Sequence, residues 1–258
     1  VPAEKLGPTG HLMAEAVQAC VHCGFCLPTC PTYGELGQEM DTPRGRILLM
    51  KEVLEGGLSL ERALPHVDRC LGCLACETSC PSGVKYRNLL GPFREKAESE
   101  HRRGLAERLR RSMLLATLPH PRHFRRAVRL GLLVRPMRRF LPKALRTMLD
   151  LLPRRLPRAD PLPVHSPALG KRRARVALLA GCAQQVIDPE INADTLAVLV
   201  RNGVEVEVPQ RQGCCGALGW HIGAGERARR HARVNLEAFP DDVDAIVTNA
   251  AGCGSGLK

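Results

Sequence analysis

The stretch CVHCGFCLPTCP, Cys20 to Pro31, recurs 50 residues later as CLGCLACETSCP, Cys70 to Pro81. The two stretches match at every cysteine and at the closing proline. Their spacing, Cys-x2-Cys-x2-Cys-x3-Cys-Pro, is typical of bacterial proteins with two [4Fe–4S] clusters, in which the fourth cysteine of each run ligates the other cluster. The repeat therefore predicts two such clusters in this part of the chain.

On this rule, each cluster takes three cysteines from one run and the last cysteine of the other run. Zinc is the alternative metal, but structural zinc sites use pairs of Cys-x2-Cys and do not need a third cysteine three residues on, so the spacing favours iron and sulfur. The predicted ligands are Cys20, Cys23, Cys26 and Cys80 for cluster 1, and Cys70, Cys73, Cys76 and Cys30 for cluster 2.

The chain between the two runs is predicted to be helical. Asp41-Thr42-Pro43 is a typical helix start, and Gly56-Gly57 ends the helix. A second helix begins after Ser59 and leads into Cys70. Compact bacterial ferredoxins join their two runs mainly through short strands and turns. The helical insertion therefore favours an all-α, helical ferredoxin domain over residues 1–100.

A basic segment follows this domain. Residues 102–158 hold 16 Arg and one Lys against Glu107 and Asp150, a net charge of +15, while the whole chain carries +12. The remainder is therefore slightly acidic, at −3. The pattern is helical with apolar faces, interrupted by prolines, and it runs into a proline-rich linker. We expect residues 101–170 to be a basic amphipathic helical segment plus this linker.

Residues 171–258 alternate between strand and helix patterns. Strands are predicted at 175–181 and 204–208 and in the sequence VDAIVTN, and helices are predicted after Asp188-Pro189 and from about Gly225 to Phe239. This order predicts a Rossmann-like βαβαβ unit. The chain as a whole is therefore predicted to be multidomain: a helical ferredoxin domain, a basic helical linker and an α/β cysteine-rich domain.

Four further cysteines follow the carboxyl ends of these three strands, where open α/β sheets bind their ligands. They could hold one more cluster or metal ion. The alternative is that some of them are small buried hydrophobic residues, as free cysteines often are. The candidate third site comprises Cys182, Cys214, Cys215 and Cys253.

Composition and motifs limit the classes of function. The 12 cysteines form tight groups in a chain of 258 residues with no signal-peptide pattern, so metal ligation in a reducing cytoplasm is expected. No apolar run reaches the 18 residues of a membrane-spanning helix. We find no catalytic set and no flavin or nicotinamide fingerprint, so no catalytic residue is predicted and substrate oxidation is expected on another subunit.

These motifs resemble the family of glycolate oxidase iron–sulfur subunits. The resemblance rests on TPRGRI beside CVHCGFC, on the second run, and on GCAQQ, QGCCGALG and NAAGCGSGLK, and it covers nearly the whole chain. It implies an electron-transfer subunit of a flavin-dependent 2-hydroxy-acid dehydrogenase. Electrons would come from an FAD-containing partner subunit and pass through the two clusters to a quinone or another acceptor.

Two departures and three alternatives accompany this resemblance. Gly256 stands where the related Cys-Cys-Gly signature closes with a cysteine, and a second copy of the domain is missing, so we expect residues 171–258 to be a truncated first copy. The alternatives are a subunit like those of heterodisulfide reductase, one like those of anaerobic glycerol-3-phosphate dehydrogenase, and a nucleic-acid-binding protein with structural clusters. No nucleic-acid partner is expected, because the basic segment lacks interleaved aromatic residues.

The basic segment is instead expected to contact an anionic membrane surface or an acidic face of the flavoprotein. The predicted location is the cytoplasm, with peripheral attachment to the cytoplasmic face of the membrane.

Overall fold

A computed structural model describes residues 1–257, apart from the side chains of Lys5 and Ala144. Lys258, the last residue of the predicted cysteine-rich domain, lies outside the described residues. The chain divides into two compact units. The first comprises residues 1–103 and 219–225, and the second comprises residues 104–218 and 226–258.

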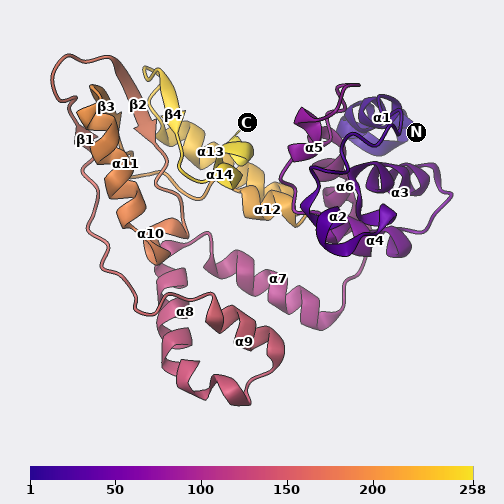
Figure 1. The fold of residues 1–258 in the computed structure, drawn as a ribbon, viewed down its shortest axis with the longest axis horizontal. Helices are drawn as coiled ribbons and strands as arrows, with labels where there is room; N and C mark the ends of the chain where they lie inside the picture. The colour runs from indigo at the N-terminus through magenta and orange to yellow at the C-terminus, as the bar shows by residue number, and fades with distance from the viewer. Residues whose placement is uncertain (258) are drawn as a thin grey trace. The chain divides into compact units, whose positions relative to one another are not determined.

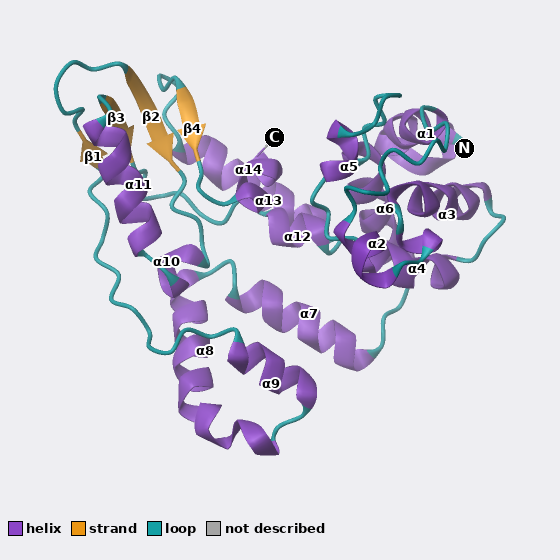
Figure 2. Ribbon diagram, viewed as in Figure 1, coloured by secondary structure: helices purple, strands orange, loops and turns teal. Residues whose placement is uncertain are grey.

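The first unit is built from helices, and its described residues contain no strand (Figures 1 and 2). In chain order they are η1 (Ala3–Thr9), α1 (Gly10–Gln18), α2 (Pro31–Leu36), η2 (Glu39–Asp41), α3 (Pro43–Glu55), α4 (Leu60–Arg69), α5 (Ala75–Thr78) and α6 (Arg87–Glu100). Helices α1, α3, α4 and α6 supply most of the core.

The two helices predicted between the cysteine runs are confirmed as α3 and α4. Thr42 caps α3, because its hydroxyl oxygen accepts a hydrogen bond of 2.9 Å from the backbone N–H of Gly45. Gly56 ends α3 with φ at +82°, a conformation that glycine adopts without steric cost. Helix α4 ends at Arg69, so the chain enters the second cysteine run directly from a helix.

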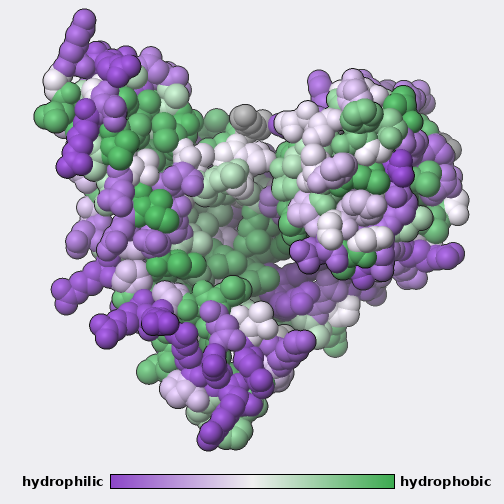
Figure 3. All heavy atoms as spheres, in the orientation of Figure 1, coloured by the Kyte–Doolittle hydropathy of each residue, from purple (hydrophilic) through white to green (hydrophobic). Residues whose placement is uncertain are grey.

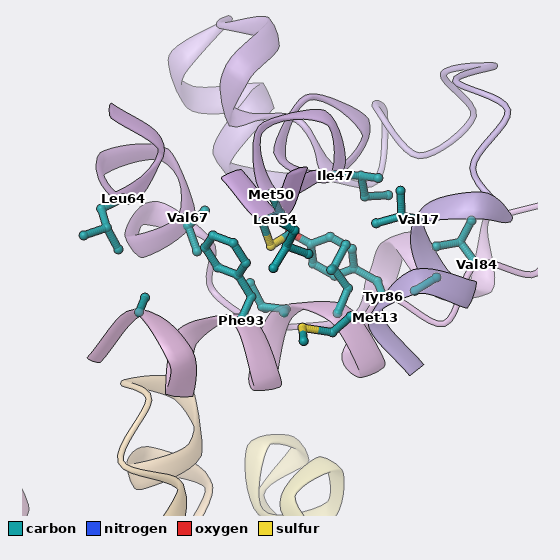
Figure 4. Close-up of a cluster of buried hydrophobic side chains, with 14 residues drawn as sticks. Met13, Val17, Ile47, Met50, Leu54, Leu64, Val67, Val84, Tyr86 and Phe93 are labelled. Carbon is teal, nitrogen blue, oxygen red and sulfur yellow. The ribbon is translucent and has the colours of Figure 1, made fainter. Parts of the chain in front are cut away.

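A hydrophobic core holds this unit together. Met50 and Phe93 meet at its centre, and Figure 4 shows them between side chains from α1, α3, α4 and α6. Val67 and Leu89 are also fully buried there. Full burial of one such side chain contributes about 1.5–3 kcal/mol relative to exposure. The core thus fixes the helices that flank both cysteine runs.

The second unit begins with the basic helices. The predicted proline breaks coincide with helix boundaries, since Pro121 opens α8 and Pro142 precedes α9. The elements are α7 (Leu105–Thr117), α8 (Pro121–Val134), η3 (Arg135–Phe140) and α9 (Lys143–Asp150). Phe124 and Val128 of α8 pack against Val186 in a small core. Val186 belongs to α10 (Gln184–Ile187), so α8 is fastened to the α/β part of the same unit.

The α/β part contains a mixed four-stranded sheet in the order β1-β3-β2-β4. Strand β2 (Ala174–Leu178) pairs in parallel with β3 (Val204–Glu207) and with β4 (Ala245–Val247). The helix α11 (Glu190–Arg201) connects β2 to β3, and α12 (Ala217–His221) and α13 (Gly225–Ala238) lie between β3 and β4 in sequence. The predicted strand and helix order is therefore present.

Two elements of this part differ from the sequence-based expectation. The proline-rich linker contributes a short strand, β1 (His165–Ser166), which pairs antiparallel with β3. This strand is stabilised by pairing with β3. The local sequence pattern did not predict it, because its pairing partner lies about 40 residues away in the sequence. The glycine-rich end of the chain forms a helix, α14 (Ala251–Leu257). Within the described residues, no helix has the length and apolar character needed to cross a membrane.

Candidate metal centres

All 12 cysteines are free thiols. Eight of them line two neighbouring pockets in the first unit. One pocket contains every predicted ligand of cluster 1, and the other contains every predicted ligand of cluster 2; Cys76 borders both. The first is lined by Cys20, Cys23, Cys26, Cys76 and Cys80, and the second by Cys30, Cys70, Cys73 and Cys76.

The backbone of the two runs explains how three successive cysteines reach one pocket. His22 and Gly24 have φ values of +54° and +89°, and Gly72 and Leu74, at the equivalent positions of the second run, have +66° and +60°. The left-handed conformation costs a residue other than glycine roughly 1–2 kcal/mol. Because His22 and Leu74 nonetheless adopt it, the same tight turn is imposed on both runs. Sequence analysis did not identify this role for either residue.

Four sulfurs around a small, mainly apolar pocket are the donor set that a [4Fe–4S] cluster requires. Burial raises the pKa of Cys20 and Cys26 and raises that of Cys76 to about 12. These thiols therefore keep their protons in the absence of metal, and cluster binding releases them. The residues present fit the group, although the assignment of each sulfur to a cluster stays a prediction.

Cys30 differs from these cysteines. Burial raises its pKa, but hydrogen bonds from the Thr32 hydroxyl, the Tyr33 backbone and the Arg46 guanidinium outweigh burial and lower it. The thiolate is thus already stabilised by polar groups that the protein supplies.

The second unit gathers the four cysteines of the candidate third site. Cys214 and Cys215 are buried, and Cys182 and Cys253 pack against the same small core as partly buried residues. The Sγ atoms of Cys182 and Cys214 are 3.5 Å apart. Sequence reasoning predicted this convergence from the three strand ends.

The four thiols influence one another's protonation. Hydrogen bonding with Cys214 lowers the pKa of Cys182, and hydrogen bonding with Cys214 and Cys253 lowers that of Cys215. The pKa values of Cys214 and Cys253 are raised by the same interactions. Protons are therefore shared unequally, because four adjacent thiolates would repel one another without a cation.

Gly256 occupies the position at which the related signature has another cysteine. A Cβ atom at this residue would lie 2.8 Å from Cβ of Ala217, closer than unstrained side chains approach. A fifth cysteine would therefore need the neighbouring helix to move. The four cysteines present are the thiolate set that this site can offer.

Residues 219–225 lie close to the second cysteine run, within the first unit. A Cβ added to Gly91 of α6 would lie 2.2 Å from Cζ2 of Trp220, and one added to Gly72 would lie 2.5 Å from Nδ1 of His221. The two glycines thus leave room for these rings. The place of His221 beside Gly72 of the ligand loop could not be predicted from the local sequence pattern.

Two family models match the chain, a 4Fe–4S dicluster domain over residues 16–84 and a cysteine-rich domain over residues 176–258. The first confirms the predicted pair of [4Fe–4S] clusters. No solved structure gives a significant match.

Curated relatives agree with the predicted resemblance. The chain is similar to the glycolate oxidase iron–sulfur subunit of Escherichia coli (strain K12), at 44% identity over 94% of this chain and 58% of that protein. It is similar to the probable glycolate oxidase iron–sulfur subunit of Bacillus subtilis (strain 168), at 41% identity over 92% of this chain and 57% of that protein. A lactate utilization protein A of Shouchella clausii is 32% identical over 32% of this chain and 34% of its own length. The chain spans less than two thirds of the length of the two glycolate oxidase relatives.

Proposed function

We propose that this chain relays single electrons through two [4Fe–4S] clusters. The chain belongs to the family of iron–sulfur proteins that join a 4Fe–4S dicluster domain to a cysteine-rich domain. The observation that carries the proposal is the pair of adjacent pockets, one lined by five cysteines and the other by four, each set drawn from both runs. A cluster changes its charge by one electron without making or breaking a bond to substrate. Adjacent clusters can therefore pass on, one at a time, electrons that a partner removes in pairs.

The substrate side of this proposal comes from the relatives. Two of them are named as iron–sulfur subunits of glycolate oxidase. We infer that an FAD-containing partner subunit oxidises glycolate or a similar 2-hydroxy acid, and that this chain conducts the electrons toward a quinone or another acceptor. The inferred fold is a helical ferredoxin domain over residues 1–100, a basic segment over 101–170 and a Rossmann-like cysteine-rich domain over 171–258.

The exchanged ligation is tested with Cys30→Ser and Cys80→Ser. Each substitution should damage the cluster that is built mainly from the opposite run. Mössbauer and EPR spectra of the anaerobically purified protein should show loss of cluster 2 in Cys30→Ser and of cluster 1 in Cys80→Ser. Loss of the same-run cluster would reverse the assignment, and wild-type protein with fewer than about eight irons per chain would reject the two-cluster relay itself.

A third metal site at Cys182, Cys214, Cys215 and Cys253 is part of the proposal. Its support is the convergence of the four sulfurs in one core. The double substitution Cys214→Ser and Cys215→Ser in the full chain should lower the metal content while leaving the spectra of the two [4Fe–4S] clusters unchanged. Equal metal content in wild-type and variant protein would show that these cysteines are structural.

The basic segment is proposed to dock on an anionic membrane surface at the cytoplasmic face or on an acidic face of the flavoprotein. Hydrophobic and hydrophilic residues are interspersed over α8 and α9 (Figure 3). Phe124 is buried in the unit's core, so Phe140 is the exposed aromatic ring of this segment, which disfavours base stacking and hence the nucleic-acid alternative. The exposed apolar residues are Leu105, Leu109, Met113, Leu130, Leu133, Val134, Met137, Phe140, Leu145, Met148 and Leu151.

A further inference from the structure

A buried arginine, Arg46, lines the pocket that holds the predicted ligands of cluster 2. The side chain of Arg46 is 1% exposed, and its Nη1 donates to Sγ of Cys30 over 3.8 Å. Its Nη2 donates to the hydroxyl of Thr32 at 2.9 Å, and its Nε donates to the carbonyl of His66 at 2.7 Å. The guanidinium is therefore held in one orientation, with one edge toward a predicted cluster ligand.

The charges around Arg46 do not cancel. Its counter-ion is Asp41, which is fully buried and lies 3.4 Å from Nη2 of Arg46. The same carboxylate also accepts from Nη1 of Arg69 at 3.0 Å and contacts Nδ1 of His66 at 3.2 Å. Two guanidinium groups thus share one carboxylate. This network carries a net positive charge, part of which is shielded from solvent.

Side-chain donors to sulfur are distributed unequally between the two pockets. Cys30 receives the Arg46 contact and lies 3.2 Å from the Thr32 hydroxyl, and the buried phenol of Tyr86 donates to Sγ of Cys70 at 3.8 Å. Among the described residues, no side-chain hydrogen bond of this kind reaches a cluster 1 cysteine.

Cluster 1 has an arginine of its own, which is differently placed. Arg44 donates to the carboxylate of Glu39 at 2.7 Å and to the carbonyl of His22 at 3.0 Å. Its side chain is 30% exposed and that of Glu39 is 47% exposed. This pair is formally neutral and screened by water. The two arginines, two residues apart in sequence, therefore give the two pockets different electrostatics.

We propose that Arg46 is a positioning residue that sets the order of reduction, by making the cluster held by Cys70, Cys73, Cys76 and Cys30 the first of the two to accept an electron. The inference rests on the cluster ligation in the proposed function. Each cluster gains one electron from a one-electron donor, with no proton and no bond exchanged, so its negative charge rises by one. Hydrogen bonds to sulfur and nearby positive charge favour the more negative state and raise the reduction potential.

Burial of Cys30 acts in the opposite direction, because a low dielectric disfavours the added negative charge. The same low dielectric strengthens the attraction of Arg46 and the hydrogen bonds to sulfur. Arg46 is itself 1% exposed and donates to the Cys30 sulfur, and the Thr32 hydroxyl lies 3.2 Å from the same sulfur, so both act on the added charge at close range. Electrons entering either cluster then settle at cluster 2, which gives the relay a direction from cluster 1 to cluster 2.

The test is a redox titration of the full chain with both clusters loaded, followed by EPR. Wild-type protein should show two midpoint potentials. Arg46→Gln should lower only the higher one, with about a tenfold fall in the reduction equilibrium constant, which is about 59 mV for a one-electron couple. Arg46→Lys should give a smaller shift, because lysine keeps the positive charge but lacks the guanidinium nitrogens that donate to Cys30 and Thr32 together. The matched control is Arg44→Gln, which should leave the higher midpoint unchanged.

Tyr86→Phe keeps the test decisive if Arg46→Gln fails to fold, because it removes only the hydroxyl that donates to Cys70. It should lower the same midpoint by a smaller amount. Two loaded clusters whose higher midpoint is unmoved in Tyr86→Phe and in any folded Arg46 variant would overturn this inference and leave the proposed relay intact. If an Arg46 variant or Tyr86→Phe shifts the lower midpoint potential instead of the higher one, the proposed order of reduction is wrong. Wild-type protein without two clusters would instead reject the proposed function.

Discussion

The hydroxyl of Thr42 acts on both sides of the start of α3. It accepts from the N–H of Gly45 at 2.9 Å and donates to the carbonyl of Glu39 at 2.7 Å. Arg44 and Arg46 follow in the first turns of α3, and they line the pockets of cluster 1 and cluster 2, respectively. One buried polar side chain therefore fixes the register in which the helix presents its two arginines.

Thr42→Ala should lower the free energy of unfolding of the protein by about 1 kcal/mol, because the first turn of α3 loses its cap. Thr42→Ser keeps the oxygen and should lose less than half of that. Urea unfolding of the iron-loaded protein, followed by circular dichroism, measures both. An alanine variant as stable as wild-type protein would show that the cap contributes nothing here.

Asp41 is a second residue whose substitution should lower the stability of the protein. Asp41→Asn keeps the shape but removes the charge that balances Arg46 and Arg69. Breaking a buried ion pair typically costs about 3–5 kcal/mol, and the amide's remaining hydrogen bonds place the expected loss near the lower end. The control is Glu39→Gln at the exposed pair with Arg44, for which about 0–1 kcal/mol is expected. Equal losses from the two variants in urea unfolding would contradict the buried network.

At the scale of elements, the segment 219–225 illustrates a contact between distant parts of the sequence. Trp220 is the one tryptophan of the chain, and it packs where α6 has Gly91. The backbone of Arg94 on the same helix lies against Gly223, where an added Cβ would be 2.5 Å from the Arg94 carbonyl oxygen. Small residues on both sides thus let the segment approach α6 closely.

Gly91→Ala should displace the Trp220 ring, because the added Cβ has no space. The expected cost is about 1–3 kcal/mol of stability, as for other overpacked sites. Fluorescence of this tryptophan should shift to longer wavelength as the ring becomes hydrated. Gly34→Ala in α2 is the control, since no atom lies within 4 Å of its added Cβ. Unchanged emission in Gly91→Ala would contradict the docking of this segment.

At the scale of the molecule, charge is separated along the chain. The +15 of residues 102–158 contrasts with −3 elsewhere. Exposed leucines and methionines accompany these arginines on α7, α8 and α9. An arginine near an anionic surface contributes about 1 kcal/mol, an effect that decays within a Debye length. Several acting together are enough for binding that salt reverses.

Substituting Glu for Arg126, Arg129, Arg138 and Arg139 should weaken the association of the protein with either the anionic membrane or the flavoprotein subunit. The iron content should not change. Co-sedimentation with vesicles containing anionic lipid, and with the flavoprotein subunit, at low and high salt identifies which target it is. Neutral vesicles are the control for charge. Retention of both associations in the four-residue variant would show that these arginines are a solvated helix face.

The sequence by itself determined the features that depend on local spacing. Each cysteine run implied one cluster, because its first three cysteines lie three residues apart on successive short turns and can bind the same cluster. The match to a dicluster domain confirms the two clusters. The starts and ends of α3 and α4 followed from Thr42, Pro43 and Gly56 for the same local reason. The order of strands and helices after residue 171 followed from periodicity.

Only the tertiary structure decided the features that depend on residues far apart in the chain. The pairing of Arg46 with Cys30 and Asp41 requires the helix to fold back on the first cysteine run, and β1 exists because β3 lies beside it. His22 and Leu74 accept a left-handed backbone because the surrounding turn demands it. Trp220 finds its place at Gly91 across more than 120 residues of sequence. Such contacts are stabilised by burial that exists only after folding, so no local pattern encodes them.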